Sequence, residues 1–398
     1  MSLVPDYDVL IIGGGLAGSA LGLALTRSQL RVALVEARAP DVSGLAQDDR
    51  ALTLAHSSRH LFEKLGLWAA ISRDCHPTAI TEIHVSGGHR SVGATHILAS
   101  DLDVEALGYV VGYGALAQLV TGAAQRGLET IAPARLQALH PVSQDHLQVD
   151  LDIGGAVRSV TTRLLVGSDG TQSTVRRLAG ISAEEQDYVR DALVLRVAPG
   201  YPLEGRAFER FTESGPIALV PRADQATLIV TLERPEVEAY LQQPEALCAL
   251  AVRQLSGRGG ALEPLGAAHR FPLRFLRADS LVANRVALIG NAAHTLHPVA
   301  GQGLNLGLRD VDVLSEILAG GVADPGAEHV LASFDALRRR DIAFTATFTH
   351  GLVQWFGASL PDRLRGLALL AIDVLPGAKR ALARRTMGWS PLLENGAR

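Results

Sequence analysis

The chain has 398 residues, of which 47% are hydrophobic and 20% are charged. This length predicts about two joined domains with a large core, and the composition excludes a disordered chain. The formal net charge of -4 gives no sign of the concentrated basic surface that nucleic acids require, so we expect no nucleic-acid partner.

The cysteines indicate whether the chain has a disulfide or metal site, and the lengths of its apolar stretches indicate whether it crosses a membrane. Cys75 and Cys248 belong to no CxxC or Cys/His cluster, so the sequence predicts neither a disulfide framework nor a metal site. The N-terminus lacks the features of a signal peptide, and no apolar stretch reaches the ~20 residues of a spanning helix. We therefore expect a cytoplasmic protein.

The N-terminal segment has the pattern of a βαβ unit. Residues 7–12 form an apolar run, 16–28 a helical stretch and 31–37 a second apolar run. The turn between the first strand and the helix reads GGGLAG, a GxGxxG sequence. Its expected roles are a tight turn at Gly13, close approach of a pyrophosphate at Gly15 and close helix packing at Gly18. Glu36 ends the second strand, where an acidic side chain would accept ribose hydroxyls, so we predict a dinucleotide site rather than a purely structural turn.

Later segments repeat the pattern of an apolar strand that stops at a glycine. Residues 163–170 and 285–291 have this form, and helical patterns follow at 173–179 and 303–319. Residues 181–277 differ: alternating strand-like stretches precede a helix-like segment at 236–256, which predicts an inserted α+β domain. Residues 328–390 are rich in Leu, Ala and Arg and predict two or three helices broken near Pro361 and Pro376.

Three motifs in order along the chain resemble the flavoprotein aromatic hydroxylases of the p-hydroxybenzoate hydroxylase fold. They are GGGLAG, SDGTQSTVR at 168–176 and GNAAHTLHPVAGQGLNLGLRD at 290–310. The resemblance implies an α/β protein with a Rossmann-like FAD-binding domain, an inserted α+β substrate domain and C-terminal helices. The expected boundaries are 1–75, 101–180 and 278–327 for the FAD-binding domain, 76–100 and 181–277 for the substrate domain, and 328–398 for the C-terminal region.

Further stretches are similar to one branch of these enzymes, the 2-polyprenyl-6-methoxyphenol hydroxylases of ubiquinone biosynthesis. They include DDRALTLAHSS at 48–58, EGRAFERFTESGPIALVP at 204–221 and RTMGW at 385–389. The resemblance implies an FAD-dependent monooxygenase that hydroxylates a polyprenylated phenol with oxygen through a flavin C4a-hydroperoxide, with NAD(P)H as electron donor. In such enzymes the cofactor carries the difficult chemistry, and the protein supplies orientation and water exclusion.

The resemblance also assigns cofactor-binding residues. The backbone of the 300–305 segment, at the start of a helix, would stabilise negative charge on the reduced flavin, and Pro298 would fix the loop beside the ring. Asn291 replaces the aspartate that usually bonds the ribityl chain, and its amide can keep that role. The complete cofactor-binding set is Gly13, Gly15, Leu16, Ala17, Gly18, Glu36, Arg50, Gln118, Asp169, Gly170, Gly290, Asn291, Pro298, Gly301, Gln302, Gly303, Leu304 and Asn305.

Three members of this set have alternative roles. Asp169 either reaches the pyrophosphate region or caps the following turn. Arg50 either flanks the flavin or pairs with Asp48 or Asp49 on the surface. Gln118 is the polar residue nearest to the position at which many relatives carry an arginine, and it faces either the cofactor or solvent.

The catalytic residue, the role of the basic C-terminal region and the function itself each have an alternative interpretation. His297, with Pro298, is the candidate catalytic residue, because an imidazole could assist phenol deprotonation; the alternative is a structural hydrogen-bonding histidine. Basic residues among the C-terminal leucines indicate either a peripheral site on the inner membrane, a contact in a ubiquinone-biosynthesis complex or a solvated helix face. A different class, a non-catalytic or reductase-type flavoprotein subunit of that complex, is the alternative function.

Overall fold

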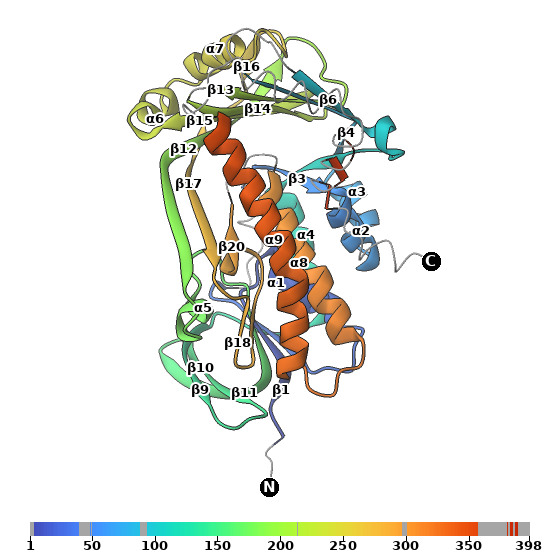
Figure 1. Cartoon of the computed structure of the whole chain (residues 1–398), viewed down its shortest axis with the longest axis vertical. Helices are drawn as coiled ribbons and strands as arrows, with labels where there is room; N and C mark the ends of the chain where they lie inside the picture. Colours follow the sequence, from blue (N-terminus) through green and yellow to red (C-terminus); the bar gives the residue numbers. More distant parts are fainter. Residues whose placement is uncertain are drawn as a thin grey trace.

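The computed structural model describes residues 4–39, 48, 50–87, 94–212, 214–296 and 301–356, together with 380, 383–384 and 387–388. Within them, strands form three sheets, of eight, nine and three strands. The eight-stranded sheet lies at one end of the molecule, and the nine-stranded sheet lies at the other, under helices α6 and α7 (Figure 1). The structure confirms the mixed α/β fold class.

The eight-stranded sheet is built on parallel strands. Its main path runs β18 (Val282–Ala283), β19 (Val286–Leu288), β11 (Ala156–Gly167), β1 (Tyr7–Ile12), β2 (Val32–Val35) and β8 (Glu129–Ile131). A hairpin of β9 (Arg135–Pro141) and β10 (Leu147–Ile153) extends β11. All six residues of β1 are buried, as expected for a parallel strand covered on both faces. Because β1, β11 and β19 run in the same direction, the glycine loops that follow them meet at one edge.

Helices cover this sheet and carry part of its core. The helices are α1 (Leu16–Leu25), α2 (His56–Lys64), α3 (Trp68–Asp74), α4 (Tyr113–Gly127), α5 (Thr174–Leu178), α8 (Gln302–Ala319) and α9 (Glu328–Phe356). Helix α1 contacts α4 and α8, and α9 runs from the region of α8 toward the nine-stranded sheet (Figure 1). The small antiparallel sheet of β3 (Ala51–Ala55), β7 (Gly108–Gly112) and β4 (Thr78–Ile80) lies beside them.

The nine-stranded sheet belongs mostly to the 181–277 segment. Its main path runs β20 (His294–Thr295), β17 (His269–Ala278), β12 (Ala183–Pro199), β15 (Gln225–Glu233), β14 (Gly215–Arg222), β13 (Arg206–Thr212), β5 (Glu82–Gly87) and β6 (Ala94–Leu98), and β16 (Leu262–Pro264) pairs with β12. One face packs a separate hydrophobic core against α6 (Arg234–Leu241) and α7 (Pro244–Gln254). The helix-like segment expected at 236–256 is helical in the structure, but it is divided in two, because Pro244, which lacks a backbone N–H, starts a second helix.

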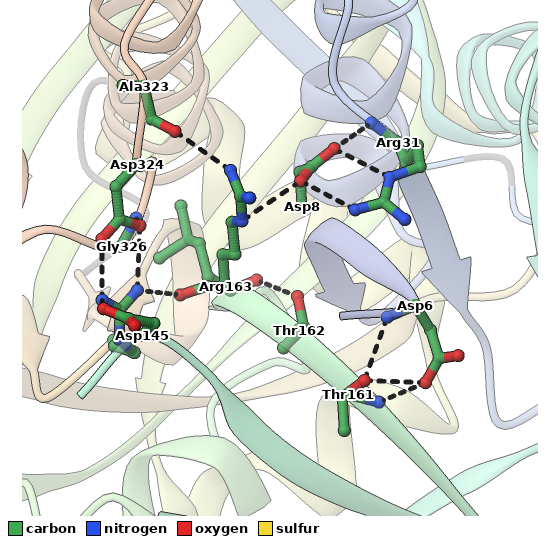
Figure 2. A network of polar contacts seen from close by, with 12 residues as sticks. Asp6, Asp8, Arg31, Asp145, Thr161, Thr162, Arg163, Ala323, Asp324 and Gly326 are labelled. Carbon is green, nitrogen blue, oxygen red and sulfur yellow. Dashed lines mark hydrogen bonds and ion pairs between the residues drawn. The ribbon is translucent and has the colours of Figure 1, made fainter. Parts of the chain in front are cut away.

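A polar network ties the eight-stranded sheet together at the edge opposite the glycine loops (Figure 2). Asp8 on β1 accepts two hydrogen bonds from the Arg31 side chain, each of 3.1 Å. Asp324, in the connection between α8 and α9, accepts bonds of 2.9 and 2.7 Å from the buried Arg285 guanidinium. Burial alone would raise the pKa of both carboxyls, but the arginine hydrogen bonds outweigh it and lower both pKa values.

This network predicts acid-sensitive stability. A carboxyl whose pKa is lowered by folding contributes stability that is complete above its unfolded pKa of about 4 and is lost as the pH falls through the lower folded pKa. We expect Asp324→Asn to reduce the free energy of unfolding by about 1–3 kcal/mol at neutral pH, because Arg285 then loses its charged partner. Urea unfolding at neutral and acidic pH measures this, and the deficit should shrink in acid.

The matched control is Asp145→Asn, since the Asp145 side chain is 76% exposed and lies 3.9 Å from Arg285. It should have little effect at either pH. An equal, pH-independent loss in both variants would contradict the assignment.

Candidate functional site

A cavity with a volume of about 1710 Å³ extends from the glycine loops of the eight-stranded sheet to one face of the nine-stranded sheet. At the first end its lining is polar and glycine-rich. The residues there include Gly13, Gly14, Gly15, Glu36, Arg38, Arg50, Arg135, Asp169, Gly170, Asn291, Gly301 and Gly303. The second end is lined mainly by Val, Ile, Leu, Phe and Ala side chains. The polar end of such a cavity suits an elongated polar ligand, and the apolar end suits a second, hydrophobic ligand.

The GxGxxG turn has the geometry expected of a phosphate-binding loop. Gly13 has a φ of 106°, and a Cβ there would lie 2.6 Å from the Ser168 carbonyl oxygen. A Cβ on Gly18 would lie 2.0 Å from the Gly13 carbonyl oxygen, so helix α1 approaches the strand end as only glycine permits. Gly15 is the N-cap of α1, and apart from its chain neighbours no described atom lies within 4 Å of an added Cβ there. The positive end of the α1 dipole therefore faces the cavity. Leu16 and Ala17, in the first turn of α1, line the cavity as well.

Glu36 lies in the cavity at the end of β2. Its carboxylate accepts bonds from the backbone N–H groups of Gly14, at 2.7 Å, and Arg38, at 2.9 Å. These bonds hold the side chain against the glycine turn. A carboxylate has about four acceptor positions, so capacity for ligand hydroxyls remains.

Asp169 and Gly170 follow β11 and also line the cavity. The Asp169 carboxylate accepts bonds from Ser173 Oγ at 2.5 Å, Thr174 N at 2.7 Å and Val175 N at 3.1 Å. The capping role of Asp169 is thus present, since these groups belong to the start of α5. Gly170 has a φ of 84° and open space at its Cβ position, which leaves the backbone accessible.

The 290–310 segment brings the third loop and the start of α8 to the same edge. Gly290 has a φ of 58° and lies so close to α8 that a Cβ on Gly307 would approach its Cα to 2.9 Å. Asn291 is exposed at the cavity. Gly301, with a φ of 60°, caps α8. An added Cβ on Gly303, in the first helical turn, would have no described atom within 4 Å apart from the backbone of its own helix. A second helix N-terminus therefore faces the cavity, lined also by Gln302 and Leu304.

Asn305 lines the cavity, but its amide is occupied by the protein. Its Oδ1 accepts from Ala55 N at 2.8 Å and Ser58 Oγ at 2.7 Å, and its Nδ2 donates to the carbonyls of Thr53 and Gly301. Through these hydrogen bonds the Asn305 side chain holds the start of α8 against the junction of β3 and α2. Its side chain acts on the shape of the site rather than on a ligand directly.

Of the two predicted cofactor-binding residues Arg50 and Gln118, Arg50 lines the cavity and Gln118 does not. Arg50 lines the cavity and pairs with Asp48, with Nε 2.7 Å from Oδ1, and its guanidinium stacks on the Tyr113 ring at 4.4 Å. Gln118 is exposed and is not among the residues that line the cavity, which agrees with the second of its two expected orientations, toward solvent. The reason is helical phase: residues four apart share a face, and the residues of α4 that line the cavity are Tyr113, Ala117, Thr121 and Gln125.

His297 and Pro298 lie outside the described residues, so their catalytic and positioning roles stay predictions. The neighbouring His294 is fully buried, and its Nε2 lies 2.7 Å from Asp310 Oδ2. A carboxylate only accepts, so His294 donates, which gives this histidine a structural role in the loop.

Asp310 is the centre of a buried network that the sequence did not reveal. Its Oδ2 also accepts from Gly290 N at 2.9 Å, and its Oδ1 accepts from Arg338 Nε of α9 at 2.7 Å. Burial would raise the pKa of Asp310, but His294 and Arg338 lower it. The network fixes the Gly290 loop to α8 and α9. The only sequence signal was an aspartate among the buried apolar positions Leu306, Leu308 and Val311.

The apolar end of the cavity is formed by the nine-stranded sheet and the C-terminal segment. Phe208 and Phe211 of β13 line it, whereas Arg206 and Arg210 of the same strand do not. Met387, only 4% exposed, reaches the same wall. This wall offers a dry surface to a hydrophobic ligand.

Comparisons with known proteins fit this geometry. A family model described as an FAD binding domain matches residues 6–348. The chain belongs to this family.

Relatives cover nearly all of the chain. The ubiquinone hydroxylase UbiL of Rhodospirillum rubrum is 34% identical over 96% of this chain and 89% of its own length. The 3-demethoxyubiquinol 3-hydroxylase of Escherichia coli is 31% identical over 96% of this chain and 98% of its own. Among solved structures, PqsL of Pseudomonas aeruginosa, a probable FAD-dependent monooxygenase, has a TM-score of 0.74 at 26% identity and covers 92% of this chain and 99% of its own.

The described residues fit the FAD that the family binds. Gly15 and Gly303, whose Cβ positions are open, let a ligand meet the N-termini of α1 and α8 without a side chain between them. Anionic groups are favoured at such helix ends. Glu36 supplies a carboxylate where ribose hydroxyls are expected. Within the described part of the chain, no helix is long and apolar enough to span a membrane.

Proposed function

We propose that the protein is an FAD-dependent monooxygenase that hydroxylates the aromatic ring of a polyprenyl-methoxyphenol in ubiquinone biosynthesis. The observation that carries the proposal is the single cavity with two unlike ends. One end has the glycine loops and helix N-termini of an FAD site, and the other is an apolar chamber. The two bacterial relatives are a ubiquinone hydroxylase and a 3-demethoxyubiquinol 3-hydroxylase, which supports the same reaction class.

The chain's residues act by binding, orientation and water exclusion. When bound, reduced FAD supplies the oxygen-activating chemistry that the side chains lack. The turn from Gly13 to Gly15 would hold the pyrophosphate end, with Gly18 allowing the close approach of α1, while Asn291 would hydrogen-bond the ribityl chain. The N-terminus of α8 at Gly301 and Gly303 stabilises negative charge in the ring system.

The apolar wall receives the substrate ring and the start of its prenyl chain. Exclusion of water there strengthens the electrostatic interactions of the site and limits side reactions. His297 and Pro298 belong to this proposal as residues beside the reacting ring, with His297 assisting proton transfer from the phenol.

The proposal also includes the electron donor for FAD and the place in the cell where the protein acts. NAD(P)H is the expected donor and binds transiently, since the chain has no second GxGxxG after a strand. A polyprenylated substrate favours peripheral contact with the inner membrane or with other enzymes of the pathway, through the basic C-terminal region.

The test is mass spectrometry of quinone intermediates in a deletion strain. We expect a precursor that lacks one ring hydroxyl to accumulate and to disappear when the wild-type gene is restored. Absence of any such precursor would contradict the proposed substrate. Accumulation of a reduced or otherwise modified quinone instead would favour a reductase-type subunit.

A further inference from the structure

A hydrophobic cluster at the apolar end of the cavity includes part of the C-terminal segment. The cluster combines side chains of the three-stranded sheet, of the nine-stranded sheet and of Ala383 and Met387. Its described members that line the cavity are Ala51, Ile80, Ile83, Ile97, Leu107, Ala207, Val220 and Met387. All of these side chains are aliphatic except that of Met387, which is a thioether. A hydroxyl group buried against them would lose its hydrogen bonds to water, so this part of the wall suits a hydrocarbon chain.

Aromatic side chains line a different part of the chamber. Phe208, Phe211 and Phe271 belong to the cavity wall but not to the cluster. Aromatic rings pair favourably with one another in stacked or edge-to-face arrangements. The chamber therefore has an aromatic part that suits the substrate ring and an aliphatic part that suits its prenyl chain.

The backbone around Met387 is anchored on two helices of the eight-stranded sheet. The Met387 carbonyl accepts a hydrogen bond of 3.2 Å from the backbone N–H of Ser57 on α2. Gly388 has a φ of 73°, and an added Cβ there would overlap Ser57 Oγ and lie 3.2 Å from Arg309 Cδ of α8. Because the N-terminus of α8 faces the end that fits FAD, these contacts give Met387 a defined position relative to the cofactor.

We propose that Met387 contacts the prenyl chain of the substrate and so gives the chamber its preference for a prenylated phenol over the same phenol without the chain. The inference rests on the proposed function and names the residue that recognises the chain. Methionine suits this role, because its unbranched, flexible side chain adapts to an irregular apolar partner. The Met387 side chain is only 4% exposed, so a chain that meets it is removed from water.

The first experiment observes Met387 in the wild-type protein. The chain has two methionines, Met1 and Met387, so labelling of the methionine methyl groups with carbon-13 gives NMR signals that are simple to assign. The Met387 signal is the one that Met387→Leu removes. FAD-loaded protein is titrated with 2-geranyl-6-methoxyphenol and with 2-methoxyphenol, which lacks the chain, while flavin absorbance reports binding. We expect the Met387 signal to shift with the prenylated probe and to move little at saturation with the other.

The second experiment shortens the side chain. Met387→Ala should raise the dissociation constant of 2-geranyl-6-methoxyphenol by about five- to tenfold, as for lost apolar contact area. It should leave the dissociation constant of 2-methoxyphenol and the FAD content unchanged. Met387→Leu should keep the preference, because it preserves the volume of the side chain.

Leu102→Ala is the matched control. Leu102 belongs to the same cluster and is also 4% exposed, but it is not among the residues that line the cavity. Its truncation should lower the melting temperature and keep the preference for the prenylated probe.

A Met387 signal that stays in place while flavin absorbance reports bound 2-geranyl-6-methoxyphenol would overturn the inference. An equal loss of affinity for both probes in Met387→Ala, or the same loss of preference in Leu102→Ala, would overturn it as well. Equal binding of both probes to the wild-type protein would overturn the role of Met387 alone. Binding of neither probe would overturn the proposed function and the inference with it.

Discussion

A Gly303→Val protein is expected to fold but to purify without FAD. Gly303 lies in the first turn of α8 and lines the cavity, and beyond the backbone of its own helix an added Cβ there meets no atom of the described residues within 4 Å. The valine side chain therefore costs the apo protein little and projects into the cavity. We expect FAD affinity to fall by about a hundredfold or more, which corresponds to roughly 2.7 kcal/mol. Flavin absorbance of the purified protein and FAD titration measure the effect.

Asn291→Asp is the control for this experiment. Asn291 is exposed at the same cavity, and an aspartate keeps the size and the acceptor oxygen of the side chain. The variant should retain FAD at close to the wild-type level. Normal flavin content and full activity in Gly303→Val would show that the start of α8 does not contact the cofactor.

The second large effect is expected for Asp310→Asn. Asp310 is fully buried and accepts bonds from Gly290, His294 and Arg338. Loss of its charge leaves the buried Arg338 with Asp341 as its remaining carboxylate. Removal of one partner from a buried ion pair typically costs about 3–5 kcal/mol, so the free energy of unfolding should fall by this amount.

FAD affinity should fall as well, because the Gly290 loop loses its anchor on α8. Urea unfolding followed by fluorescence, together with FAD titration, measures both effects. Asp145→Asn again serves as the exposed control and should change neither quantity appreciably. A loss below about 1 kcal/mol would show that the network contributes little to the fold.

The sequence predicted the parts of the site that depend on local backbone requirements. Gly13 and Gly18 are needed where the chain turns sharply and where helix and strand approach, and such needs are visible in a short motif. The strand, turn and helix pattern around each loop likewise follows from hydrophobic periodicity. Resemblance to a known family then supplied the cofactor, which the GxGxxG turn alone does not distinguish from NAD.

What the sequence could not predict depends on contacts between distant segments. Asp310 and Arg338 lie 28 residues apart and form a pair only through the packing of α8 against α9. Gln118 was assigned to the site from its position in the chain, but one step along a helix rotates a side chain by about 100°, which takes it off the cavity face. The occupied amide of Asn305 could not be foreseen either, because its partners Ala55 and Ser58 lie 250 and 247 residues away.

The source of the oxygen atom in the product distinguishes a monooxygenase from the alternatives. Purified, FAD-loaded protein would be incubated with a short-chain 2-polyprenyl-6-methoxyphenol, NAD(P)H and dioxygen enriched in a heavy isotope, and the product analysed by mass spectrometry. We expect a ring-hydroxylated product with one labelled oxygen atom, and no such product from protein without FAD. A hydroxylated product whose oxygen comes from water, or no hydroxylated product with any reductant, would contradict it.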